Sequence, residues 1–116
     1  MSNELYNNAS NENGGAIYNT SGNTTITDSA FIDNQATDGG AIYVKAGSAT
    51  ITDGEFRNNQ ATNGGAIFNG TDGVLNIREN VTFENNSANG NYGGAIYFNH
   101  GSLYVNNCYF RSKLAN

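Results

Sequence analysis

Few residues of this 116-residue chain have types and spacings suited to chemistry. Asp28 and Asp53 fall at equivalent positions of a repeating pattern, and Asp33 aligns with Asn58 and Asn85. Carboxylates of this kind can hold a calcium ion or serve as the opposed acid and base of a glycoside hydrolase. Short acidic and amide side chains also bond to the backbone of turns, and this explanation accounts for the pattern better. We predict no metal site and no cofactor.

Two residue types common in active sites occur once each, as His100 and Cys108. His100 stands beside a glycine in a predicted turn. Cys108 is predicted to occupy a small inward position, because the residues aligned with it are Ser29, Gly54 and Val81. A single cysteine excludes a disulfide scaffold. Since no serine or cysteine lies in a nucleophile motif, we predict that the protein is not an enzyme.

One phrase, Gly-Gly-Ala-Ile followed by an aromatic residue, is repeated four times. It occurs at Gly14–Tyr18, Gly39–Tyr43, Gly64–Phe68 and Gly93–Tyr97. The starts lie 25, 25 and 29 residues apart. A period of this size is typical of stacked repeat architectures rather than of one globular core.

Two further columns of residues keep the same period. An aromatic residue and, three positions later, an asparagine precede each of three glycine pairs: Phe31 and Asn34, Phe56 and Asn59, Phe83 and Asn86. A β-branched residue follows each glycine pair by 12 or 13 positions. We predict that both columns form the core, with the members Ile26, Ile51, Ile77, Val105, Phe31, Phe56, Phe83 and Phe110. Tyr6, eight residues before Gly14, is predicted to be the first aromatic of its column.

Short runs rich in β-branched and aromatic residues alternate with clusters of Asn, Gly, Ser, Thr and Asp, which predicts strands and turns. A unit of about 25 residues with three strands and three turns returns the chain to its starting phase. The predicted fold is therefore an all-β, right-handed parallel β-helix, with the hand taken from the general preference of parallel connections. It forms one domain over 1–116, of about four and a half coils at roughly 6–30, 31–55, 56–82 and 83–109, with a partial coil at 110–116.

The glycines and asparagines are predicted to shape the turns. A corner that recurs in every coil needs positive φ, which glycine adopts without steric cost. The predicted turn glycines are Gly14, Gly15, Gly39, Gly40, Gly64, Gly65, Gly93 and Gly94. We expect Asn34, Asn59 and Asn86 to stack their amides in a ladder along the solenoid. Proline is absent, as expected where each N–H bonds to a neighbouring coil.

The two motifs in order, as in residues 83–88 followed by 93–97, resemble the repeats of bacterial polymorphic outer-membrane proteins and related autotransporter or adhesin-like surface proteins. The resemblance spans nearly the whole chain. It implies a β-helical passenger segment located extracellularly or at the cell surface. It also implies a role in adhesion, with a host-surface protein or a glycan as partner.

The aromatic residues that end the repeated phrase form a candidate contact column: Tyr18, Tyr43, Phe68 and Tyr97. Each follows an isoleucine that is predicted to face inward, so alternation turns the aromatic outward. An exposed column of rings could contact sugars or a protein partner. Alternatively, the rings stack on one another and hold the register of the strands. If Ala16 and Tyr18 face inward instead, the column belongs to the core.

Charge and hydropathy argue against two further classes of protein, those that bind nucleic acid and those that span a membrane with a helix. Five scattered basic residues and a net charge of −5 argue against nucleic acid, and no stretch is long and apolar enough for a membrane-spanning helix. Unpaired strands at both ends favour end-to-end self-association. A patch at Thr25, Thr27, Thr50 and Thr52 resembles the flat threonine arrays of ice-binding β-helices, but it covers only two coils.

The sequence thus predicts a non-enzymatic structural or adhesive segment of a surface protein. The alternatives are a carbohydrate-binding module or, with less support, a polysaccharide-cleaving one, and a self-assembling or ice-binding solenoid.

Overall fold

The computed structural model describes residues 3–99 and 101–111, and in these residues the secondary structure consists of strands without helices. Short β-branched and aromatic runs form the strands, as their residue types favour. The strands are β1 (Asn3–Tyr6), β2 (Ile17–Asn19), β3 (Asn23–Thr27), β4 (Ser29–Ile32), β5 (Ile42–Thr52), β6 (Glu55–Arg57), β7 (Gln60–Asn63), β8 (Ile67–Glu84), β9 (Ser87–Tyr92), β10 (Ile96–Phe98) and β11 (Ser102–Arg111).

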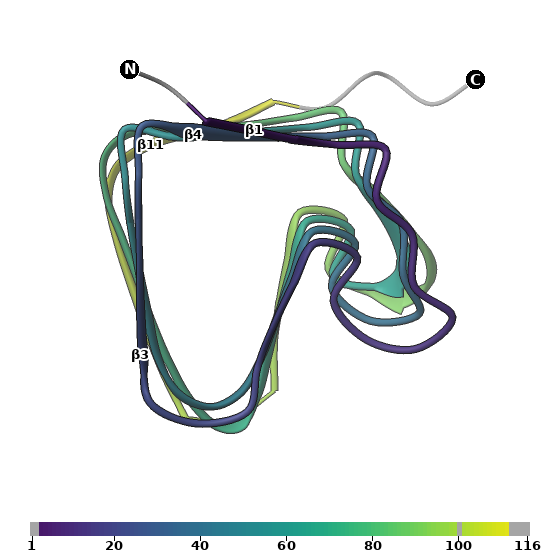
Figure 1. Ribbon diagram of the computed structural model, residues 1–116, viewed down its shortest axis with the longest axis horizontal. Coiled ribbons are helices and arrows are strands. Elements are labelled where there is room, and N and C mark those ends of the chain that lie inside the picture. The colour runs from purple at the N-terminus through teal and green to yellow at the C-terminus, as the bar shows by residue number, and fades with distance from the viewer. Residues whose placement is uncertain (1–2, 100, 112–116) are drawn as a thin grey trace.

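Each coil follows three walls and one protruding arm (Figure 1). The Phe wall, along the upper edge of that view, contains β1, β4, β6 and residues 81–84 and 108–111. The Ile wall, along the left edge, contains β3 and residues 48–52, 74–78 and 102–106. The GGAI wall contains β2, β10 and residues 42–44 and 67–69. The arms, on the right, are residues 8–13, 34–38, 59–63 and 86–92.

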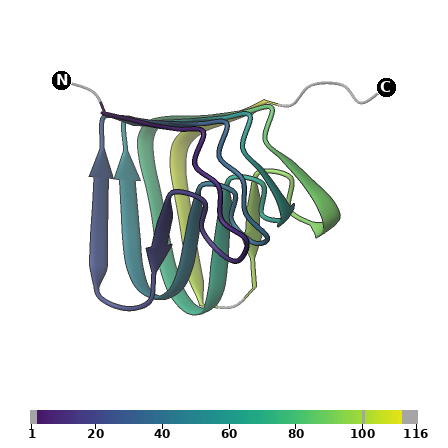
Figure 2. The same cartoon turned by 45° about the vertical axis from the view of Figure 1, so that its right-hand side comes forward.

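Equivalent residues of successive coils lie side by side in parallel strands, as Figure 2 shows for the Ile wall. Ile26 pairs with Ile51, which pairs with Ile77, and Ile77 pairs with Val105. The phenylalanines of the Phe wall align in the same way. The predicted parallel β-solenoid of about four turns is confirmed. The stack is squat, because its axis is the shortest of the extents of 38 × 29 × 23 Å (Figure 1).

Each wall buries two columns of residues, such as those of Leu75 and Ile77 on the Ile wall. Phe31, Phe56 and Phe83 are at most 1% exposed, and their rings stack with centroids 4.7 and 4.8 Å apart. Burial of one such side chain contributes about 1.5–3 kcal/mol, and ring stacking adds roughly 0.5–1.5 kcal/mol per pair. Val105 and Phe110 occupy the predicted columns but remain 44% and 50% exposed, because no further coil of the described chain covers them. Their predicted burial is wrong, although their register is right.

The prediction for Tyr6 is also wrong. Leu5 pairs with Phe31 and begins the column, whereas Tyr6 pairs with Ile32 and is 57% exposed. The cause is the first arm, in which Ala9 and Asn13 pair with Gln35 and Asp38. This arm is one residue longer than the second, so counting back from Gly14 gives the wrong position.

The two glycines of each pair have different roles. The first has positive φ, between 61° and 69° in the four repeats, as predicted. The second does not, and it is required for another reason. A Cβ on Gly40 would meet the carbonyl oxygen of Gly65 in the next coil. In the same way, a Cβ on Gly15 would meet the carbonyl oxygen of Gly40. The second glycine therefore allows close approach of backbones rather than an unusual turn.

Candidate functional site

The aromatic column lies on the outer face of the GGAI wall. Ile42 and Ile67 point into the core with no exposed surface, and the aromatic after each points the other way. Tyr43 stacks on Phe68 with ring centroids 4.9 Å apart and an interplanar angle of 11°. Tyr18 on one side and Tyr97 on the other make edge contacts, at 5.3 and 4.8 Å. The rings stack on one another, as one of the sequence-based alternatives expected.

Exposure differs along this column. Tyr18 is 48% exposed and Tyr43 and Tyr97 are partly exposed, whereas Phe68 retains only 8% of its surface. The faces available to a partner therefore belong to the tyrosines. Phe68 supports its neighbours from within the stack.

The hydroxyl of Tyr43 lies in a partly buried, electronegative setting. Burial raises the pKa of its phenol, and nearby Tyr18 and Asp38 raise it further. Asp38 belongs to the arm and accepts a hydrogen bond from Nδ2 of Asn63 at 3.0 Å. The aromatic column is thus within electrostatic range of the arm, and ionisation of Tyr43 is disfavoured.

The predicted asparagine ladder is present and extends by one residue to Asn8. The side-chain oxygen of Asn59 accepts from both the backbone N–H and the Nδ2 of Asn34, at 3.0 and 2.9 Å. Nδ2 of Asn59 donates to Oδ1 of Asn86 at 2.9 Å and to the carbonyl of Phe31 at 3.0 Å. We call Asn8, Asn34, Asn59 and Asn86 the inner amide ladder. Asn34 and Asn59 are fully buried, so the ladder is a structural element and not an accessible site.

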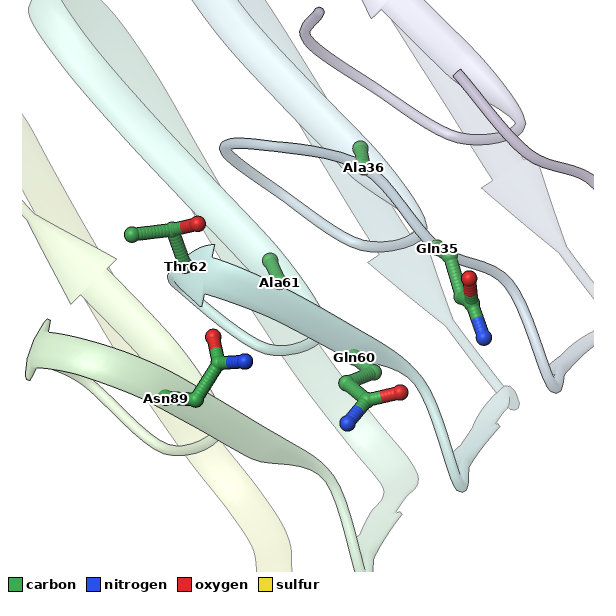
Figure 3. A pocket seen from close by; sticks show the side chains of 6 residues that line it. All are labelled: Gln35, Ala36, Gln60, Ala61, Thr62 and Asn89. Atoms are coloured by element: carbon green, nitrogen blue, oxygen red, sulfur yellow. The ribbon is translucent and has the colours of Figure 1, made fainter. Parts of the chain in front are cut away.

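The residues after the inner ladder point outward. Gln35 and Gln60 are exposed, pair with each other across successive coils and form the outer amide row. With Ala36, Ala61, Thr62 and Asn89 they line an open hollow of about 190 Å³ on the arm (Figure 3). Sequence reasoning missed this site, because Gln recurs in only two of the four coils and the other members are Ala9 and Ser87.

The acidic residues and the cysteine that could serve catalysis or metal binding occupy structural positions. Asp28, Asp33 and Asp53 all have positive φ, between 54° and 59°, as expected of turn residues that tolerate the left-handed region. In the described part of the chain, no three His, Cys, Asp or Glu side chains gather as a metal site. Cys108 pairs with Val81 in a half-buried position, and burial raises the pKa of its thiol, which disfavours the reactive thiolate. His100 lies outside the described residues.

The threonine patch lies on the Ile wall and ends as the sequence indicated. Thr25 pairs with Thr50, but Asn76 and Tyr104 continue the row. A regular hydroxyl array therefore spans two coils.

Both end faces of the stack leave core residues uncovered. The first has a hollow of about 420 Å³ lined by residues including Leu5, Ile17, Ile26 and Phe31. The last has one of about 250 Å³, with Phe83, Ala95 and Phe110 in its lining. End-to-end association remains a prediction. The structure describes no helix that is long and apolar enough to cross a membrane.

These features define the chain as a parallel β-solenoid built from four similar repeats. The family described as the Chlamydia polymorphic membrane protein repeat matches residues 4–20, 28–45, 53–70 and 80–99, which together exceed half of the chain. The chain belongs to this family of polymorphic membrane protein repeats. No curated protein and no solved structure matches the chain.

The matched segments correspond to definite parts of each coil. Every segment contains the Phe wall, the arm and the GGAI wall, and the segments leave out the whole of the Ile wall. The family pattern therefore covers the arm and the aromatic column, which carry the exposed candidate residues.

Proposed function

We propose that this chain is a non-enzymatic adhesive segment of a surface-exposed protein, which extends the molecule and displays a lateral binding face. The observation that carries the proposal is the continuous aromatic column along the side of the stack. Tyr18, Tyr43 and Tyr97 present partly exposed rings on the first, second and fourth coils. Membership in a membrane-protein repeat family supports a location at the outer membrane or cell surface.

The column suits contact because its rings are held in place before a partner arrives. Each tyrosine touches another ring at a centroid distance of 4.8 to 5.3 Å, and the strands beneath are fixed by pairing. Little side-chain freedom remains to be lost on binding, which favours affinity. Tyrosine combines a large apolar face with a polar hydroxyl, as contact surfaces on proteins often do.

The test is attachment of coated microspheres to cultured epithelial cells. The variant Tyr18→Leu/Tyr43→Leu keeps an apolar cover on the GGAI wall but removes two rings. The matched control Tyr104→Leu removes a tyrosine that is 60% exposed on the Ile wall. We expect the double variant to lower attachment several-fold, the control to match the parent, and circular dichroism to show the same β content in all three. A parent that does not attach, or equal loss in the control, would contradict the proposal.

A further inference from the structure

The hollow on the arm combines residues of three successive coils. Gln35 and Ala36 come from the second arm, Gln60, Ala61 and Thr62 from β7, and Asn89 from β9. In Figure 3 the two glutamines extend in a row to one side of the arm strands, and Asn89 points from β9 toward β7. The hollow therefore exists only because the coils stack.

Two local features shape the surroundings of the hollow. Ala36 and Ala61 project to the side of the arm strands opposite the two glutamines, and Ala61 is only 3% exposed. β9 comes close to β7 at Gly90, where a Cβ would meet the carbonyl oxygen and Cγ2 of Thr62. The hollow of about 190 Å³ is smaller than the roughly 300–1,000 Å³ of pockets for drug-sized ligands, so it suits one small ring.

The chemistry of the lining is polar and uncharged. Gln35, Gln60 and Asn89 each offer an amide donor and an amide acceptor, and Thr62 adds a hydroxyl. Within the described residues the side chains of these four make no hydrogen bond, in contrast to the saturated inner amide ladder. No acidic or basic side chain lines the hollow, so it offers no charge complement to an ion.

The backbone beside the hollow is not free to bind an extended peptide. The N–H of Ala36 donates to Gln60, and that of Thr62 donates to Thr37, at 3.2 and 2.8 Å. The N–H of Ser87 donates to Asn59 at 2.9 Å. Strand addition needs an open row of backbone groups, and here those groups already bond to the neighbouring coil. Only side chains with paired donor and acceptor character remain for a ligand.

We propose that this hollow is a subsite for one residue of a neutral oligosaccharide. Sugar hydroxyls both donate and accept, which matches the amides and the hydroxyl of the lining. The inference goes beyond the proposed function, because it places a ligand contact on the arm and not on the aromatic column. Each proposal can therefore fail without the other.

The experiment is a titration of the parent chain, followed by NMR, with a set of neutral oligosaccharides of glucose, galactose, mannose and N-acetylglucosamine. Sialylated and sulfated glycans and an uncharged peptide serve as comparison ligands. We expect at least one neutral glycan to shift the side-chain amide signals of Gln35, Gln60 and Asn89. The amide signals of the inner ladder should stay unchanged.

The variant Gln60→Ala/Asn89→Ala removes two of the hydrogen-bonding side chains and should weaken binding about tenfold. The matched control Asn76→Ala removes an outward amide on the Ile wall and should leave the affinity unchanged. Absence of shifts with every neutral glycan overturns the proposal. So do shifts caused by charged glycans or the peptide alone, and equal weakening in the control.

The two proposals separate cleanly in these assays. Attachment of microspheres that is lost in Tyr18→Leu/Tyr43→Leu but kept in Gln60→Ala/Asn89→Ala, with no glycan shifts, supports adhesion and refutes the sugar subsite. Glycan shifts without attachment support the subsite and refute adhesion.

Discussion

The inner amide ladder and the outer amide row contain similar side chains and are adjacent in the sequence, yet they differ in almost every physical respect. Asn34 and Asn59 are fully buried, and their amides bond both to each other and to backbone carbonyls. Gln35 and Gln60, one residue later, are exposed. Asn34 and Asn59 directly follow residues with positive φ, at the bend into the arm, where their amides turn inward, and the glutamine after each is exposed. Burial therefore decides whether an amide stabilises the fold or stays available to a ligand.

The largest loss in the free energy of unfolding should come from Asn59→Ala. It would leave the N–H and Nδ2 of Asn34 without their acceptor and the carbonyl of Phe31 without a side-chain donor. A buried polar group that loses its partner costs about 1–3 kcal/mol, so we expect a loss of roughly 3 kcal/mol or more in the free energy of unfolding. Denaturant titration measures this loss.

Gln60→Ala is the matched control for that substitution, one residue further along the chain. It should change the free energy of unfolding by less than about 0.5 kcal/mol, as is usual for an exposed position without specific contacts. Similar losses in the two variants would show that the inner and outer amides do not differ as described.

A smaller effect is expected at the end of the inner ladder. Asn8 is only half-buried, and its Nδ2 makes one bond, to Oδ1 of Asn34 at 2.9 Å. That oxygen also accepts from the backbone N–H of Asn8, which an alanine keeps. We expect Asn8→Ala to cost about 1 kcal/mol, the contribution of one hydrogen bond. The same denaturant titration checks the value, and a loss as large as that of Asn59→Ala would contradict the role of burial.

The smallest expected effect is on the pH dependence of stability and involves the phenol of Tyr43. This residue is less buried than Asn34 and Asn59 of the inner amide ladder and less exposed than the outer amide row. Its pKa is raised in the folded state by burial, by Tyr18 and by Asp38, whereas the unfolded chain ionises near the ordinary value of 10.0. The stability linked to this group is complete below that pH and is lost as the pH rises through the folded pKa.

The measurement is the midpoint of denaturant unfolding as the pH is raised above about 9. The parent should lose more stability over this range than Tyr43→Phe, with Tyr104→Phe on the Ile wall as the control. An identical slope in the parent and in Tyr43→Phe would contradict the assignment.

Much of the fold was predictable because the core columns repeat in every coil. Ile26, Ile51 and Ile77 recur at nearly constant spacing, and the parallel register follows from that recurrence. The prediction for the first coil was wrong because its arm is one residue longer than the second. The constant spacing to the glycine pair therefore assigned Tyr6 to the position that Leu5 occupies. The role of the second glycine was missed because close approach between coils depends on packing, and one repeat taken alone does not reveal it.

The candidate sites were predictable to different degrees. The aromatic column was found because it recurs in every coil, although the low exposure of Phe68 depends on its stacked neighbours. The hollow on the arm could not be found, since it combines single residues of three unlike arms. A site built from what differs between repeats leaves no periodic signal.

The spacing of the Phe wall has a consequence for the gene as well as for the protein. From Leu5 through Phe31, Phe56 and Phe83 to Phe110 the steps are 26, 25, 27 and 27 residues, yet every column stays aligned. The extra residues lie in the arms and bends, for example in the long fourth arm and at Glu79, so each is absorbed within its own coil. Recombination between repeats of unequal length therefore need not shift the pairing of the strands that follow, and new arms can arise without loss of the scaffold.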